Sequence, residues 1–423
     1  MSFPDSIHPK VADFFRKTES ELSDAYSEID AVSVSVTERV LNSFRKNRVS
    51  AMHFYPSTGY GYDDAARDKL DLVYADALQT EKAIVSPQIA SGTHALSLML
   101  YGISKPGDRI LIASGTPYDT IHDVFGIGNT ILPHSLASLS IATTVLSLKD
   151  DRIDLEGLEE KLKTCDPSII YLQRSRGYSW RNALSLDEIE ETVKTIRKHL
   201  PNVIIALDNC YGEFTQKIEP SALGIDIMAG SLIKNPGGGL APTGGYIAGK
   251  ADLVRLVADR MTVPGIGREI GSYAGSYIPF YQGLFLAPHV VAQSKKTAVL
   301  IAAVFEKLGF ETLPSKSALR NDIVQSVRFN TAEQMISFCK SVQSFSPVDS
   351  YVTPEPSDMP GYSDKVIMAA GTFIQGSSIE WSADGPIRPP YTCYIQGGLT
   401  YEHGKIAFSH AVDDLYRNGL ITL

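Results

Sequence analysis

The sequence predicts an α/β protein with a large, mostly parallel β-sheet between helices, followed by a smaller α+β domain. From about residue 80 to residue 250, short apolar segments alternate with segments whose apolar residues recur at helical spacing. Strands that alternate with helices form parallel sheets that are covered on both faces. After a long helical stretch at 284–308 the pattern changes, which indicates a second domain.

Seven short apolar segments of the first region predict strands. They are residues 83–85, 109–113, 141–146, 168–172, 203–207, 227–232 and 244–248. Segments with helical spacing lie between them at 91–101, 155–163 and 186–200. In sheets of this type ligands bind at the carboxyl ends of the strands, so residues just after a strand are the first candidates for a functional site.

The two ends of the chain have other patterns. Residues 1 to about 50 are predicted to be helical and polar, with an apolar stripe that needs another surface to cover it, such as a second subunit. Near the C-terminus we expect strands at 322–328, 371–374 and 391–395 and a helix at 332–344. We therefore divide the chain into an N-terminal helical arm (1–55), a large domain (56–295) and a small α+β domain (296–423).

Composition excludes several classes of protein. The net charge of −9 over 423 residues disfavours nucleic acid or an anionic membrane as the main partner. The four cysteines are far apart and form no CxxC pair, which disfavours a structural zinc site or a disulfide framework and fits a reducing compartment. The start of the chain lacks a basic region followed by an apolar stretch, and no run has the roughly 18 apolar residues of a membrane span. We expect a cytoplasmic protein with a small-molecule partner.

The first candidate site segment is Ser91-Gly92-Thr93, which opens a predicted helix after a strand and a short turn. A helix start offers free backbone N–H groups and a partial positive charge, and glycine lets an anion approach closely. The segment is therefore a suitable phosphate cradle. Taken alone, ordinary N-capping by Ser91 explains it better, since such caps are common.

The second segment is the apolar strand 203–207, which ends in Asp208. A carboxylate at the end of a buried strand is costly unless a cation or hydrogen-bond donors satisfy it, and a protonated pyridine nitrogen is such a cation. An Asp that caps the next turn is an equal alternative.

The third segment places Lys234 between an apolar strand and the glycine cluster 237–239. Burial would lower the pKa of this amine and favour imine formation. A surface lysine is an equal alternative for the motif alone, whereas a P-loop is a poor one because no Gly-Lys-Ser/Thr follows the glycines. Together, the three segments supply what pyridoxal phosphate needs: a phosphate site, a partner for its ring nitrogen and an amine for its aldehyde.

With these segments the chain resembles the fold type I pyridoxal phosphate enzymes. It is most similar to the methionine gamma-lyase-like or aluminium resistance group in the cystathionine and methionine gamma-lyase branch. The segments that carry the resemblance are residues 57–64, 91–95, 117–120, 234–239, 282–289 and 396–403. The resemblance covers nearly the whole chain. It implies an aspartate-aminotransferase-like fold with a seven-stranded sheet, and a homo-oligomer whose subunits share active sites.

The resemblance also implies roles for single residues. Lys234 would hold pyridoxal phosphate as a Schiff base and move the proton at the substrate α-carbon, and Asp208 would pair with the ring nitrogen. The phosphate would be bound by a set of hydroxyl and backbone groups, completed by a tyrosine lent across a dimer: Ser91, Gly92, Thr93, Ser231 and Tyr60. Tyr118 would stack on the ring and assist the leaving group, although plain packing of an aromatic side chain remains an alternative.

Three departures from the lyase pattern put the substrate in doubt. The lyases have Tyr-x-Arg where this chain has Tyr60-Gly61-Tyr62. Residues 173–178 replace the lyase loop that carries an Asn near the cofactor hydroxyl, where Arg176 or Ser175 could serve instead, and the arginine that usually binds the substrate carboxylate has no clear match. Arg388 and Arg176 are the candidates for substrate binding, and a solvated loop arginine is an equal alternative for Arg388.

The sequence thus predicts elimination at a carbon–sulfur bond of a sulfur amino acid, of the cystathionine or methionine type. Two hypotheses compete with it. The same residues could serve an aminotransferase or an elimination on a non-sulfur amino acid. Alternatively, the chain could keep the fold as a non-catalytic binding protein, which the presence of both Asp208 and Lys234 disfavours.

Overall fold

The computed structural model describes residues 6–128, 131–359 and 364–423. The chain forms two compact units, one of Val36–Phe285 and one that joins Met1–Ser35 to Leu286–Leu423. The boundaries fall within two long helices, α2 (Ser23–Lys46) and α9 (Ile278–Lys307). The domain division at residues 55 and 295 remains a prediction.

The larger unit is built around a seven-stranded sheet of order β1-β7-β6-β5-β4-β2-β3. Its strands are β1 (Lys82–Ser86), β2 (Arg109–Ile112), β3 (Ala142–Val145), β4 (Ile169–Gln173), β5 (Ile204–Asp208), β6 (Ile227–Ser231) and β7 (Gly245–Gly249). Neighbouring strands are parallel except at β7, which is antiparallel to both β1 and β6. The predicted mostly parallel sheet is confirmed.

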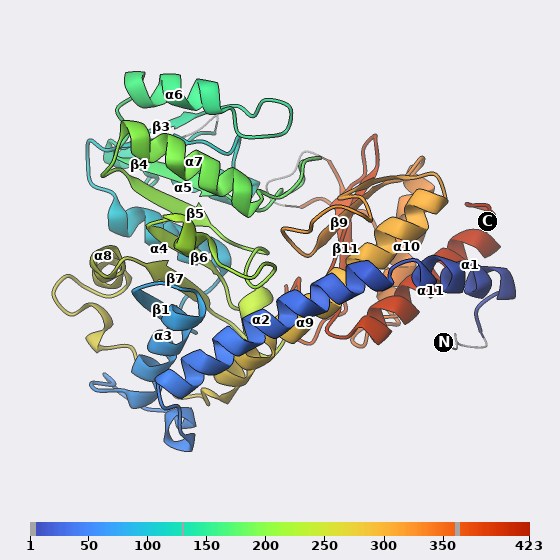
Figure 1. Cartoon of the computed structure of the whole chain (residues 1–423), viewed down its shortest axis with the longest axis horizontal. Coiled ribbons are helices and arrows are strands. Elements are labelled where there is room, and N and C mark those ends of the chain that lie inside the picture. The colour runs from blue at the N-terminus through green and yellow to red at the C-terminus, as the bar shows by residue number, and fades with distance from the viewer. Residues whose placement is uncertain (1–5, 129–130, 360–363) are drawn as a thin grey trace. The chain divides into compact units, whose positions relative to one another are not determined.

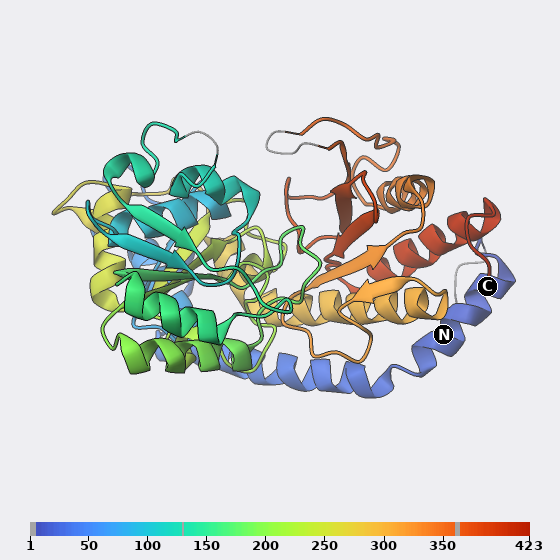
Figure 2. The ribbon, with the colours of Figure 1, turned by 90° about the horizontal axis from the view of Figure 1, so that it is seen from above.

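Helices cover both faces of this sheet (Figures 1 and 2). Side chains of α4 (Gly92–Ile103), α5 (Asp119–Phe125) and α8 (Ala251–Met261) share one apolar core with alternate strand residues such as Ile169 and Tyr171. Ile170 and Leu172 are also buried but point to the other face, because side chains alternate along a strand. The remaining helices of the unit are α3 (Ala65–Ala77), α6 (Leu155–Thr164), α7 (Leu186–His199) and the short 3₁₀ helices η1 (Ala51–Phe54), η2 (Ala137–Leu139), η3 (Pro220–Leu223), η4 (Asn235–Gly237) and η5 (Gly267–Glu269).

The smaller unit has a five-stranded antiparallel sheet of order β10-β11-β12-β9-β8. The strands are β8 (Glu311–Leu313), β9 (Val324–Arg328), β10 (Val366–Ala369), β11 (Ser382–Pro386) and β12 (Thr392–Gln396), and the helices besides α9 are α1 (Pro9–Ser20), α10 (Ala332–Ser344) and α11 (Tyr401–Arg417). A cluster of phenyl rings, including Phe305, Phe338 and Phe408, forms its core. The predicted small α+β fold is confirmed.

Most predicted elements lie within two residues of the observed ones, but the strand expected at 371–374 is wrong. The Glu380 carboxylate accepts the backbone N–H groups of Phe373 (2.8 Å) and Ile374 (2.9 Å), and the Thr372 hydroxyl bonds the carbonyl of Ile374. These side chains take the bonds that a neighbouring strand would make. The long helix also begins at Ile278 rather than at residue 284.

Within the described ranges, no helix combines the length and apolar character that crossing a lipid bilayer requires.

Candidate active site

The site begins where β4, β5 and β6 end together. Their register pairs Gln173 with Asp208, and Asp208 with Ala229, so these strand ends lie at one edge of the sheet. Asp208 is buried, and its Oδ1 accepts the backbone N–H of Cys210 at 3.0 Å. Burial raises the pKa of Asp208, while the charge of Lys234 and the Cys210 N–H act in the opposite direction. A cation near Asp208 therefore matters to its charge state.

Lys234 follows β6 and starts a tight turn. Gly237 closes the turn, since a Cβ at that position would lie only 1.8 Å from the carbonyl oxygen of Leu232. Asn235 fixes the turn to the chain after β5, because its amide group donates to the carbonyls of Tyr211 and Glu213, each at 2.9 Å. The glycine cluster thus shapes the turn that carries Lys234.

Lys234 is half-buried, and its Nζ lies 3.9 Å from the centre of the Tyr211 ring. Burial lowers the pKa of Lys234, as the sequence suggests, but the acidic groups of Cys210, Tyr211, Asp208 and Glu213 outweigh it and raise the pKa above its ordinary value. The expectation of a lowered pKa is therefore wrong for the free amine. The turn after β5 thus presents acidic and aromatic groups to the amine of Lys234, and we call this turn the lysine receptor.

The amino end of α4 lies against these strand ends. A Cβ placed on Gly92 would lie 3.1 Å from Cβ of Ser231 and 3.6 Å from Sγ of Cys210, so Ser231 and the helix start are in contact. Ser91 is the N-cap, and its Oγ accepts the N–H of His94 at 3.1 Å. Ser91 therefore caps the helix, as the simpler interpretation held. The helix geometry leaves the N–H groups of Gly92 and Thr93 without intrahelical partners.

Tyr118 is connected to the same edge through Gln173. Tyr118 is the N-cap of α5, and its backbone N–H donates to Oε1 of Gln173 at 2.6 Å. A Cβ on Gly177 would lie 3.2 Å from the Tyr118 ring, so this ring borders the loop after β4. The hydroxyls of Thr93 and Thr120 are 3.0 Å apart and join the starts of α4 and α5.

Three predicted site residues lie elsewhere or have another environment. Tyr60 is 69% exposed and stacks on Tyr62, so within one chain it lies on the surface. Arg388 belongs to the smaller unit, where its half-exposed side chain pairs with Asp364 at 2.8 Å. Arg176 is buried in the loop after β4, beside the Gly177 that borders Tyr118.

Sequence reasoning missed Gln173, Tyr211 and Glu213. Gln173 stands in register with Asp208, so aligning the two strand ends would have found it. Tyr211 and Glu213 lie within five residues of Asp208, in the turn that receives Lys234. An acidic residue two positions after an aromatic one, directly behind a buried strand, was the available signal.

Comparison with known proteins identifies the family. A sequence model of methionine gamma-lyase matches residues 11–416. The chain belongs to the methionine gamma-lyase family. It is 49% identical over 406 residues to the uncharacterized protein YnbB of Bacillus subtilis, covering 96% of each chain. The resemblance inferred from the motifs therefore extends over nearly the whole chain.

Solved structures of family members are close matches. A provisionally assigned cystathionine beta-lyase involved in aluminium resistance, from Listeria monocytogenes, is 48% identical with a TM-score of 0.92, and the match covers 95% of this chain and 99% of that one. A carbon–sulfur lyase involved in aluminium resistance, from Clostridium novyi, is 44% identical with a TM-score of 0.93, covering 97% and 96%. This methionine gamma-lyase family member is therefore an enzyme of a carbon–sulfur lyase family.

The fold extends to distant pyridoxal phosphate proteins. The pyridoxal-5'-phosphate-dependent protein YhfS of Escherichia coli is 15% identical with a TM-score of 0.62, covering 91% of this chain and 96% of that one. The fold type I prediction is confirmed.

The residues present fit pyridoxal phosphate. The start of helix α4, where the first N–H groups have no intrahelical partners, contacts Ser231, and this arrangement suits a phosphate. The buried Asp208 needs a cationic partner, which a protonated ring nitrogen supplies. Lys234 stands at the adjacent strand end and is electrostatically coupled to Asp208. The donor set therefore matches the three parts of the cofactor.

Proposed function

We propose that the chain is a pyridoxal phosphate-dependent carbon–sulfur lyase that eliminates a thiol from the β- or γ-carbon of a sulfur amino acid. Ammonia and a keto acid are the other products. The observation that carries the proposal is the electrostatic coupling of Lys234 to Asp208 at adjacent strand ends, with the start of α4 in contact beside them.

Each chain residue has a role in this proposal. The N–H groups and hydroxyls of Ser91, Gly92, Thr93 and Ser231 would hold the phosphate. Asp208 would hold the proton of the ring nitrogen, and the ring of Tyr118 would stack on the cofactor. The bound cofactor supplies an aldehyde for Lys234 and an electron sink for charge at the α-carbon.

Lys234 and Tyr118 would move protons. Lys234 must lose its own proton before its amine can remove the α-proton of the substrate. The acidic turn opposes that loss, because it stabilises the ammonium. Tyr118 would donate a proton to the leaving sulfur.

The two arginine candidates differ in preorganisation for a substrate carboxylate. Arg176 is buried near Tyr118, whereas Arg388 is held by Asp364 on the other unit. We propose Arg176 as the first candidate. Exchange of Arg176 for Lys should raise KM about tenfold or more, because a bidentate contact is lost.

Subunit sharing and location are also proposals. An exposed Tyr60 fits a residue that completes the site of a partner subunit, as the resemblance implies. We further propose a homo-oligomer in the cytoplasm.

A substrate panel tests the function. Purified enzyme with pyridoxal phosphate is given cystathionine, methionine, cysteine and non-sulfur amino acids, and ammonia, thiol and keto acid are measured, with Lys234→Ala as the blank. Ammonia and thiol formed in equal amounts without an added keto acid support the proposal. Product formation only with a keto-acid acceptor would show an aminotransferase instead.

A further inference from the structure

The lysine receptor contains a buried carboxyl group, that of Glu213, which has no role in the proposed reaction. Glu213 has 0% exposure, and its Oε1 accepts a hydrogen bond from Tyr246 OH at 2.8 Å. Its Oε2 is buried and has no hydrogen-bond partner among the described residues. Burying an acid this way costs free energy, so the fold must gain something from it.

The sheet makes room for this carboxyl. A Cβ on Gly230 would lie 2.6 Å from Oε1 of Glu213 and 2.6 Å from Cε1 of Tyr246. Any side chain larger than that of glycine at position 230 of β6 would therefore displace the pair. Position 230 comes just before Ser231, and Asn235, next to Lys234, donates to the backbone carbonyl of Glu213, so Glu213 packs against the segment that carries Lys234.

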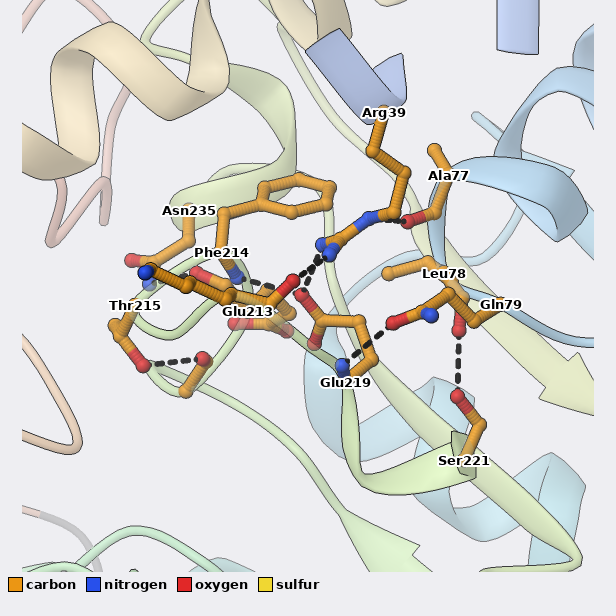
Figure 3. A network of polar contacts seen from close by, with 12 residues as sticks. Arg39, Ala77, Leu78, Gln79, Glu213, Phe214, Thr215, Glu219, Ser221 and Asn235 are labelled. Atoms are coloured by element: carbon orange, nitrogen blue, oxygen red, sulfur yellow. Dashed lines mark hydrogen bonds and ion pairs between the residues drawn. The ribbon is translucent and has the colours of Figure 1, made fainter. Parts of the chain in front are cut away.

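The neighbouring acid, Glu219, is paired differently. Its Oε1 accepts from Nη2 of Arg39 and from the N–H of Phe214, at 2.9 and 3.0 Å. Figure 3 shows this network with Glu213 and Asn235 next to it. Glu219 thus has a cation at hydrogen-bond distance, whereas the side chain that bonds Glu213 is the neutral phenol of Tyr246.

The charge state of Glu213 follows from its surroundings. Burial raises the pKa of Glu213 to about 8, and the negative charge of Glu219 adds to this rise. Hydrogen bonds from its own backbone N–H and from Tyr246, and the charge of Lys234, act in the opposite direction. The other ionisable groups coupled to it lie on α3, after β5 and on β7: Tyr74, Cys210 and Tyr246. Arg39 and Arg174 act on Glu219, and Asp208 acts on Lys234.

We propose that Glu213 is a positioning residue: as a fully buried carboxyl, bonded by Tyr246 and packed against the segment that carries Lys234, it sets how readily that amine gives up its proton. Below about pH 8, Glu213 adds no negative charge to the receptor, and Lys234 loses its proton more easily. Above that pH, the ionised Glu213 stabilises the ammonium. The value of this control for catalysis rests on the proposed function of Lys234.

Competitive labelling tests the inference without any cofactor. Cofactor-free protein is treated with a trace of acetic anhydride between pH 6 and pH 10, and modification of Lys234 is measured by peptide mass spectrometry. Wild type and Glu213→Gln should react alike at pH 6, because position 213 is neutral in both. Above pH 8 the variant should react about tenfold faster, since one nearby negative charge is missing.

Glu219→Gln is the matched exchange of a second buried acid, one that is already paired with Arg39. Because the charge of Glu219 raises the pKa of Glu213, this variant should keep the slow labelling of Lys234 at high pH, with its onset moved to a less alkaline pH than in wild type. Two results would overturn the inference. One is a Glu213→Gln profile identical to wild type at every pH. The other is a difference of equal size at pH 6 and pH 10, which would indicate altered packing.

Tyr246→Phe keeps the test decisive if Glu213→Gln does not fold. Loss of the phenol raises the pKa of Glu213, because its hydrogen bond lowers that pKa. The slowing of Lys234 labelling should then start at a more alkaline pH than in wild type, and an unchanged onset counts against the inference.

The second measurement is the rate at which pyridoxal phosphate attaches to Lys234, followed by absorbance. The rates of wild type and Glu213→Gln should differ only above the pH at which Glu213 ionises. If wild type attaches no cofactor, the proposed function fails, while the labelling still decides the role of Glu213.

Discussion

Each compact unit contains a buried acid near a lysine, and the two sites are completed differently. In the smaller unit, Glu19 receives Nζ of Lys405 and the hydroxyl of Tyr401, each at 2.6 Å, so both carboxylate oxygens are bonded. In the larger unit, Lys234 lies over a tyrosine ring, and Glu213 has one oxygen without a partner among the described residues. A fully paired site stabilises a structure, whereas an incompletely paired one leaves charge to be changed during a reaction.

The largest effect expected from this contrast is a loss of activity when Lys234, the lysine of the incompletely paired site, is replaced. Lys234→Ala should reduce kcat on the order of 10³-fold or more, because under the proposed function it removes both the amine that holds the cofactor and the group that moves the proton. The thermal midpoint without cofactor should stay near that of wild type. Turnover assays and thermal denaturation check this, and appreciable turnover in the variant would break the assignment.

The second effect is on stability. Lys405→Met should destabilise the protein by about 3–5 kcal/mol, because Glu19 would be left buried without its cation. Denaturant titration measures the loss. The activity per folded molecule should be unchanged, and a selective loss of activity would contradict a purely structural role for this pair.

The third effect is on the pH dependence of stability. The pKa of Glu213 is about 8 in the folded protein, above its ordinary value of 4.5. The folded state therefore keeps a proton that the unfolded state loses, so this contribution is complete below about pH 4.5 and is lost as the pH rises through 8. In Glu213→Gln the thermal midpoint should vary less with pH over that window than it does in wild type. A slope as steep as in wild type would show that Glu213 is ionised when folded.

The fourth and smallest effect concerns the hydrogen bond itself. Tyr246→Phe should cost about 1–2 kcal/mol, since a buried carboxyl oxygen loses its donor. Denaturant titration below pH 6 measures this cost. A change of less than a few tenths of a kcal/mol would indicate that another group takes over the bond.

Local pattern was enough to predict the strands of the seven-stranded sheet and the turn that carries Lys234, whereas β8, β10 and β11 of the smaller sheet were missed. Asp208 and Lys234 stand at the ends of continuous apolar segments, and their roles depend on those ends meeting at one sheet edge, as the register shows. The partners of Lys234 could not be predicted, because Tyr211 reaches it only through a turn in which Tyr211 itself has φ 71°, in the left-handed region. The predicted lowering of the pKa of Lys234 was wrong for the same reason. Burial follows from the local sequence, but the opposing charges come from residues that only the fold brings close.

Residues 371–374, where a strand was predicted and none forms, show in the smaller unit that local pattern does not report contacts made by the fold. Its residues have a strand-like composition, but the Glu380 carboxylate takes the backbone bonds of Phe373 and Ile374. A side chain six or seven positions away decided the local structure, and no periodicity reports such a bond.

The reversed strand β7 has a consequence for how the enzyme is made. In the described sheet, β1 is an edge strand whose neighbour is β7, about 160 residues further along the chain. During synthesis on the ribosome, the segment that leads into α4 thus waits unpaired until residue 249 has emerged. Contacts of such long sequence separation form late and slowly. The amino end of α4 should be among the last parts of the nascent chain to become ordered, and a truncated product that ends before β7 should be a substrate for chaperones and proteases.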